Sequence, residues 1–96
     1  MKIAIDIDGT ICKEKPTFEK VLAEPFPEAL EKINKMKDNG HQIIFFTARG
    51  WNEYNATKYW LDKHGFKYDL LLCGKPTYDY IIDDRSLQPE WDSINL

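Results

Sequence analysis

The sequence predicts an α/β fold around a small parallel sheet, and two patterns carry that prediction. Short apolar runs alternate along the chain with longer stretches in which apolar residues recur at helical spacing. The run at 43–46 has four consecutive apolar residues, which is typical of a strand covered on both faces of a parallel sheet. Right-handed crossovers would then bring the carboxyl ends of the strands to one edge.

The composition indicates one small globular domain over residues 1–96, because 43% of the residues are hydrophobic and 30% are charged. A net charge of −3 gives no overall electrostatic footprint for nucleic acid. No apolar run approaches membrane-spanning length, and Met1 leads straight into a strand, so we expect a cytoplasmic protein without membrane contact. Cys12 and Cys73 are too few for a disulfide framework or a zinc site. Cys12 is interpreted as a plain reduced thiol, with a reactive thiol as the alternative.

The first apolar run, residues 3–5, is predicted to be a buried strand that ends in two carboxylates, Asp6 and Asp8. A strand period of two can place both side chains on one side, at the end where open α/β sheets bind ligands. Gly9 allows a sharp turn or a close approach to a ligand. Two like charges so close are costly unless a cation or a raised pKa relieves them. The alternative is a solvated Asp-Gly turn at a strand end.

Two helices are predicted, at about 27–39 and 52–64. The first begins at Pro27, ends at Gly40, and has apolar residues at helical spacing: Leu30, Ile33 and Met36. The second is expected to place these residues on its core face: Tyr59, Trp60 and Leu61, with Ala56 and Thr57 one turn earlier. The polar segment 11–26 is predicted to be a loop with a short hairpin or a helical turn.

Three further strands are predicted, at 42–46, at about 68–73 and at 80–82, which gives a four-stranded sheet. Beyond them the pattern weakens, so residues 86–96 either dock on the body or form a loose tail.

Each predicted strand is followed by polar residues at its carboxyl end. These residues are Asp6 and Asp8, then Thr47, then Lys75, and finally Asp83 and Asp84. Because these ends share one edge of a parallel sheet, we expect the side chains to converge. Clustered carboxylates suit Mg²⁺, and Lys75 and Thr47 could hold an anion beside the metal. That combination fits phosphoryl transfer.

The same residues resemble the four motifs of the haloacid dehalogenase (HAD) superfamily of phosphohydrolases, in the order of that family and over about residues 1–85. More narrowly, the stretches at 46–49, 57–61, 74–76 and 82–85 look like small phosphatases linked to capsular polysaccharide synthesis. The stretch at 82–85 is also similar to one in deoxyribonucleotidases. The resemblance implies a three-layer α/β/α, Rossmann-like (HAD-like) fold with a small parallel sheet.

The resemblance also implies roles for individual residues. Asp6 would be the nucleophile and form an aspartyl-phosphate, while Asp8 would protonate the leaving oxygen and then activate water. Mg²⁺ would be held by the Asp6 carboxylate, the Asp8 backbone carbonyl and one of two neighbouring aspartates, Asp83 being favoured over Asp84. The residues expected to act on the phosphoryl group are Thr47 and Lys75. The set expected to bind substrate comprises these two together with Gly9, Thr10, Ala48 and Arg49.

The intervals from Thr10 to Thr47 and from Thr47 to Lys75 are too short for a substantial cap domain. The site is therefore expected to exclude water through the 11–26 loop, a neighbouring subunit or the substrate. A homo-oligomer is one way to complete such a short core. Arg49, Trp51 and Tyr54 could line the mouth of the site, or the two aromatic residues could pack the start of the second helix.

We therefore expect a Mg²⁺-dependent phosphomonoesterase for a small phosphorylated metabolite, and a sugar phosphate in polysaccharide biosynthesis is the favoured substrate. A nucleoside monophosphate is the alternative substrate. A non-catalytic module that binds phosphate or metal is the alternative class of protein.

Overall fold

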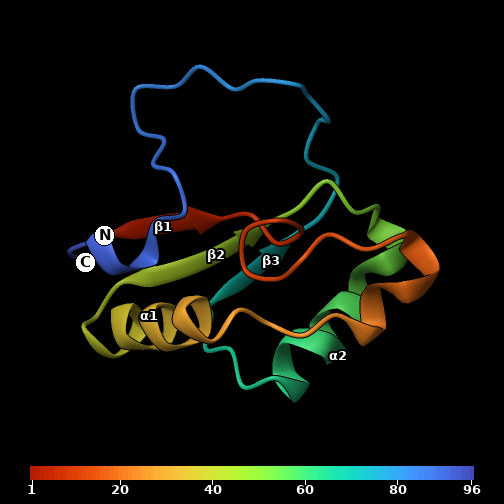
Figure 1. The fold of residues 1–96 in the computed structure, drawn as a ribbon, viewed down its shortest axis with the longest axis horizontal. Coiled ribbons are helices and arrows are strands. Elements are labelled where there is room, and N and C mark those ends of the chain that lie inside the picture. The colour runs from red at the N-terminus through yellow and green to blue at the C-terminus, as the bar shows by residue number, and fades with distance from the viewer.

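Three parallel strands form the sheet, and the structure, a computed structural model, describes all residues 1–96. The strands are β1 (Lys2–Ile5), β2 (Gln42–Phe46) and β3 (Leu70–Leu72), in the spatial order β1-β2-β3. The helices α1 (Pro27–Asp38) and α2 (Tyr54–Lys63) connect them. Short 3-10 helices are η1 (Thr17–Leu22), η2 (Trp51–Glu53) and η3 (Trp91–Ser93). The predicted α/β fold with a small parallel sheet is confirmed (Figure 1).

One face of the sheet carries the core. The strand register aligns Ile5 with Phe45, and Phe45 with Leu71, so these three buried side chains point to the same face. Ile33 of α1 and Trp60 of α2 belong to the same apolar cluster. Both helices therefore pack on one face of the sheet, below it in Figure 1.

The opposite face of the sheet is only partly covered, whereas helices on both faces were expected. Ala4 and Leu70 are exposed on this face, and Ile44 and Phe46 are half-buried. The strands follow one another across the sheet in one direction, and crossovers of one hand then place both helices on the same side.

The predicted fourth strand is wrong. Residues 76–90, here named the arch segment, stand apart from the body between β3 and η3 (Figure 1). No strand forms at 80–82, and the side chain of Ile82 is 100% exposed. An apolar, β-branched run favours a strand only where a neighbouring strand and a packing surface accept it, and these residues have neither.

The predicted tail divides into two parts, because residues 91–96 dock on the body whereas residues 86–90 stay exposed on the arch segment. Trp91 of η3 is buried, and its indole N–H donates to the carbonyl of Thr10 at 3.4 Å. Ile94 and Leu96 pack against the core. The tail thus contacts the loop that follows β1.

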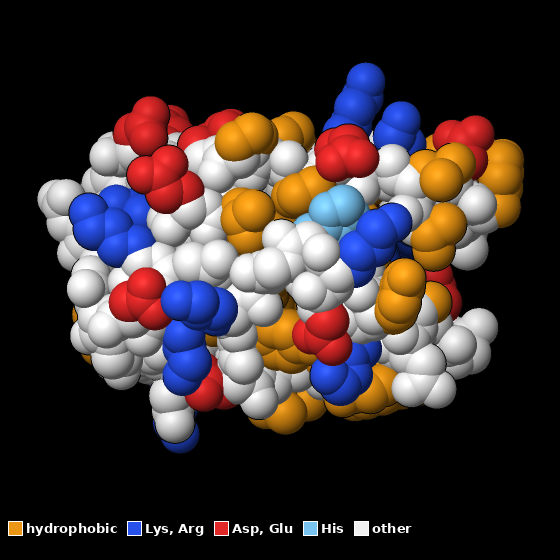
Figure 2. All heavy atoms as spheres, turned by 90° about the horizontal axis from the view of Figure 1, so that it is seen from below, with side chains coloured by type: hydrophobic (Ala, Val, Ile, Leu, Met, Phe, Trp, Pro, Cys, Tyr) orange, Lys and Arg blue, Asp and Glu red, His pale blue; other side chains and the backbone are white.

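The helix face of the molecule mixes charges of both signs, with apolar side chains between them (Figure 2). Three surface ion pairs contribute to this pattern: Lys37 with Asp69, Lys67 with Asp38, and Lys58 with Asp62. None of the helices has the length and apolar character needed to cross a membrane.

Candidate functional site

The end of β1 turns sharply, and this turn places two carboxylates at the edge of the sheet. Gly9 has a φ of +83°, a left-handed conformation that side-chain-bearing residues rarely adopt. Its N–H donates to the carbonyl of Cys12 at 2.8 Å, and the N–H of Thr10 donates to that of Ile7 at 3.0 Å. These backbone N–H groups of Gly9 and Thr10, expected to bind substrate, are therefore bonded inside the turn.

Asp6 is the more open of the two carboxylates, with 38% of its side chain exposed. The hydroxyl of Thr10 donates to its Oδ2 at 3.1 Å. Its Oδ1 lies 3.7 Å from the Nζ of Lys75, which belongs to the segment after β3. Asp6 therefore faces a cation and a hydroxyl while it remains accessible to a ligand.

Asp8 is held very differently, by a two-pronged ion pair with Arg49. The Nε of Arg49 donates to Asp8 Oδ2 at 2.9 Å, and Nη2 donates to Oδ1 at 2.7 Å. Burial disfavours the charge on Arg49, but the hydrogen bond and the charge of Asp8 more than offset burial, so the pKa of Arg49 is raised. The two like charges at the end of β1 are thus relieved by two cations, Lys75 and Arg49.

The ends of β2 and β3 are joined to each other by backbone hydrogen bonds. The N–H of Lys75 donates to the carbonyl of Thr47 at 2.9 Å. The hydroxyl of Thr47, which is buried, accepts from the N–H of Arg49 at 3.1 Å. Ala48 is exposed between them, and its N–H has no acceptor within the protein. An unpaired N–H beside a lysine is suited to an anion.

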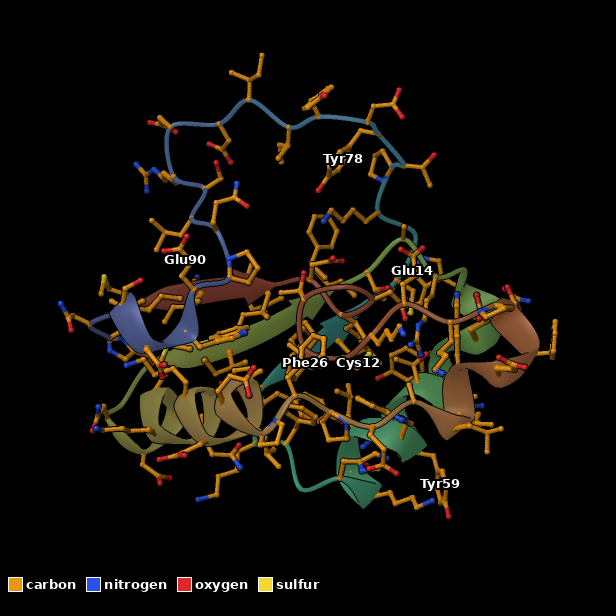
Figure 3. The ribbon with its side chains drawn as sticks, in the orientation of Figure 1. Cys12, Glu14, Phe26, Tyr59, Tyr78 and Glu90 are labelled. Carbon is orange, nitrogen blue, oxygen red and sulfur yellow. The ribbon has the colours of Figure 1, made fainter.

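Three of the four predicted strand ends therefore converge, and the fourth does not. Asp83 and Asp84 are exposed on the arch segment, where Asp83 Oδ1 accepts from the N–H of Arg85 at 3.2 Å. Figure 3 shows the arch segment apart from the sheet, with Tyr78 at one end and Glu90 at the other. The ring of Tyr78 is the link to the edge, because the Nζ of Lys75 lies 5.1 Å from its centroid.

The predicted magnesium ligands are not assembled in this arrangement. Nowhere in the structure do three or more His, Cys, Asp or Glu side chains gather as a metal site. Both carboxylate oxygens of Asp8 are paired with Arg49, and Asp83 and Asp84 lie on the arch segment. Carboxylates are the right ligands for Mg²⁺, but here they are in the wrong places to form one site.

The residues expected at the mouth of the site also separate into two groups. Arg49 is inside rather than at the mouth, with 4% of its side chain exposed. Trp51 is exposed by 58% and stacks on Tyr54 with ring centroids 5.8 Å apart. A Cβ added to Gly74 would meet the indole nitrogen of Trp51 at 2.9 Å, so Trp51 lies beside the segment that leads to Lys75.

Cys12 lies beneath this edge, among the buried residues (Figure 3). Burial and the nearby charge of Asp8 raise the pKa of its thiol to about 11. Since the thiolate is the reactive form, this environment favours the interpretation as an inert thiol.

Sequence reasoning missed the part played by Thr57, which it treated only as a core-face residue. Thr57 is fully buried, and its hydroxyl accepts from Nη1 of Arg49 at 3.1 Å. The available signal was a hydroxyl on the apolar face of α2, since a buried polar group requires a partner. Tyr59, also expected on the core face, points outward instead (Figure 3).

Fold and strand ends together define the class of protein, a HAD-like fold of the phosphatase type. A crystal structure of a Vibrio cholerae protein is similar with a TM-score of 0.83 and 31% identity, over 99% of this chain and 89% of that one. A chain of the Pnkp1/Rnl/Hen1 complex is similar with a TM-score of 0.66 and 26% identity, over 85% of this chain and 30% of that one. The predicted superfamily is confirmed.

Within that class, the chain belongs to the family described as the LNS2 domain of PITM 1-3, which matches residues 3–85. A stretch of 42 residues is 40% identical to a Bacillus cereus protein called "Putative nucleotidase". That stretch covers 44% of this chain but spans only 22% of the relative. These similarities support the superfamily and not the narrower likeness to capsular polysaccharide phosphatases.

Proposed function

We propose that this protein hydrolyses phosphate monoesters through an aspartyl-phosphate on Asp6. The observation that carries the proposal is the pair of unlike carboxylates at the end of β1: Asp6 is open and beside Lys75, whereas Asp8 is clamped. Membership in a family with a phosphatase-type fold supports the same activity. A nucleophile must be accessible, and a proton-transfer group must be fixed in position.

The proposed reaction has two steps. The Asp6 carboxylate attacks phosphorus and the ester bond breaks. The leaving oxygen takes a proton from Asp8, which carries the proton that it removed from water in the preceding turnover. Asp8 then removes a proton from water, the water oxygen attacks phosphorus, and inorganic phosphate leaves while Asp6 is restored. Lys75 Nζ and the free N–H of Ala48 are the groups best suited to the phosphoryl oxygens.

Mg²⁺ is the cofactor that the sequence predicts, and HAD-like phosphatases generally use it. A magnesium site in this chain would require the arch segment to bring Asp83 or Asp84 toward Asp6, since these ligands lie apart in the structure. The metal requirement is therefore a question separate from the identity of the nucleophile.

The substrate we propose is a small phosphorylated metabolite, with a sugar phosphate favoured from the sequence. A nucleoside monophosphate is the second candidate, and the exposed ring of Trp51 beside Gly74 supports it, as does the similarity to the Bacillus cereus protein. An aromatic ring can stack on a base. Replacing Trp51 with alanine should raise KM for nucleotides and leave KM for small aliphatic phosphates unchanged.

Hydrolysis of p-nitrophenyl phosphate, measured in Mg²⁺ and in EDTA, tests the activity itself. We expect turnover by the wild-type protein and none by Asp6→Asn. Absence of turnover in both buffers would favour the alternative class, a non-catalytic module that binds phosphate or metal. A panel of sugar phosphates and nucleoside monophosphates would then rank the substrates by kcat/KM.

A further inference from the structure

Arg49 is the only group that holds the Asp8 carboxylate. Its Nε and Nη2 contact the two oxygens of Asp8 at 2.9 and 2.7 Å, and no other side chain donates to them. A guanidinium fork that binds both oxygens fixes the plane of a carboxylate as well as its position. The orientation of Asp8 therefore depends on the orientation of Arg49.

Arg49 is in turn fixed from three directions. Thr57 of α2 accepts from its Nη1 at 3.1 Å. Its backbone N–H donates to the Thr47 hydroxyl, and its carbonyl accepts from the N–H of Gly74 at 2.8 Å. The side chain is 4% exposed, so solvent does not compete for these contacts. The contacts join α2 and the ends of β2 and β3 to the carboxylate at the end of β1.

Lys75 contacts Asp6 in a different way from that in which Arg49 contacts Asp8. Lys75 approaches Asp6 at 3.7 Å with a single ammonium, and Asp6 stays 38% exposed. Asp8 is 17% exposed and paired at both oxygens. A single ammonium suits binding of a phosphoryl group, whereas a planar fork suits the orientation of a carboxylate.

We propose that Arg49 is a positioning residue that sets the plane of Asp8 for proton transfer to the leaving oxygen, an inference that rests on the proposed phosphatase activity. Arg49 itself does not touch the substrate. Its contribution should therefore depend on how much the leaving group needs a proton, and it should be independent of whether the substrate carries a second anionic group. Thr57 supports the same arrangement indirectly, because it contacts Arg49 and not Asp8.

The test compares two esters of nearly equal size, p-nitrophenyl phosphate and phenyl phosphate. The first releases a stable phenolate with little need for a proton, and the second releases a more basic one. For Arg49→Leu we expect kcat on phenyl phosphate to fall roughly 100-fold, as for a misplaced catalytic group. On p-nitrophenyl phosphate the loss should be several-fold smaller. KM should be nearly unchanged for both esters.

Companion variants make the result specific to Asp8. Asp8→Asn should show the same dependence on the leaving group, and adding Arg49→Leu to it should cost little more, since both changes affect one function. Arg49→Lys should recover part of the loss. Lys67→Ala, which removes a surface ion pair with Asp38, is the matched control and should leave both rates unchanged.

Thermal melts accompany every rate. If Arg49→Leu does not fold, the ratio of rates on the two esters is taken from Arg49→Lys and Thr57→Val, for which we expect smaller losses in the same direction. Equal losses on both esters, or full additivity with Asp8→Asn, would overturn the role of Arg49 while leaving the phosphatase activity intact. A wild-type protein that hydrolyses neither ester would overturn the proposed function and, with it, this role.

Discussion

The edge of the sheet and the arch segment carry the same kind of residue in opposite circumstances. At the edge, Asp6 and Asp8 each face a cation, and the neighbouring strand ends are hydrogen-bonded to one another. On the arch segment, Asp83 and Asp84 are exposed, and Asp83 has a partner only within its own turn. The aspartates at the edge are therefore held by residues from other strand ends, whereas Asp83 is held only by its own turn.

The edge and the arch segment differ in how much packing holds their backbone in place. The edge residues follow strands whose side chains reach the apolar core, so their backbone is fixed by packing. The arch segment follows β3 but adds no strand, and its apolar side chains, such as Ile82, remain in solvent. Segments with few buried contacts open at low cost in free energy. We therefore expect the edge to be rigid and the arch segment to be adaptable.

The largest effect should come from Asp6→Asn. The amide is nearly the same size as the carboxylate but is a poor nucleophile, so turnover should be lost while the melting temperature changes little. Steady-state assays with p-nitrophenyl phosphate, together with circular dichroism, check both halves of this prediction. Substantial hydrolysis by Asp6→Asn would mean that the open carboxylate is not the nucleophile.

Asp8→Asn should also impair turnover, by roughly 10²- to 10⁴-fold, which is the usual contribution of a positioned acid or base. The paired control is Asp38→Asn, which removes a surface carboxylate that is bonded to Lys67. That control should keep full activity. An Asp8→Asn protein with the wild-type rate would remove Asp8 from proton transfer.

The two ion pairs of the edge should differ strongly in their effect on folding. Arg49→Leu leaves the mostly buried Asp8 without its only partner, which should cost about 3–5 kcal/mol of stability. Lys75→Ala breaks a longer and more open pair, which should cost about 1 kcal/mol or less. On p-nitrophenyl phosphate the order should reverse, with Lys75→Ala the slower enzyme. Urea unfolding ranks the two variants by loss of stability, and initial rates on the same samples rank them by loss of activity.

The smallest effect should come from Asp83→Asn in EDTA. Because Asp83 is exposed and lies apart from the edge carboxylates, its replacement should change stability by no more than about 0.5 kcal/mol. Wild type should gain about 2.7 kcal/mol at a Mg²⁺ concentration about a hundred times the dissociation constant if the arch segment supplies a ligand. Asp83→Asn should then gain much less.

Melting curves of the wild-type protein and of Asp83→Asn, each in EDTA and in Mg²⁺, test whether Asp83 is a metal ligand. An equal gain by the two proteins would show that Asp83 is not a ligand, and Asp84 would be the next carboxylate to replace.

Much of this organisation could be predicted from the sequence, because periodicity reports which face of an element is buried. The three strands of the sheet, the helix that begins at Pro27 and the convergence of Asp6, Thr47 and Lys75 follow from apolar patterns and parallel topology. These are consequences of local sequence and of the shared edge of a parallel sheet.

What could not be predicted depends on contacts between distant residues. Nothing near Arg49 in sequence indicates that its side chain turns inward, because its partners, Asp8 and Thr57, are brought there by β1 and α2. The arch segment fails as a strand for a related reason. Residues 80–82 have the composition of a strand, but composition does not supply a neighbouring strand to pair with.

The most direct test of the central claim is to trap the covalent intermediate. The protein would be mixed with a phosphomonoester, quenched in acid, digested and analysed by mass spectrometry, with Asp6→Asn as the control. We predict a phosphorylated peptide with the phosphoryl group on Asp6 in the wild-type protein and none in the variant. A phosphoryl group on Asp8, or rapid hydrolysis in which no residue of the β1 turn is ever phosphorylated, would contradict the account.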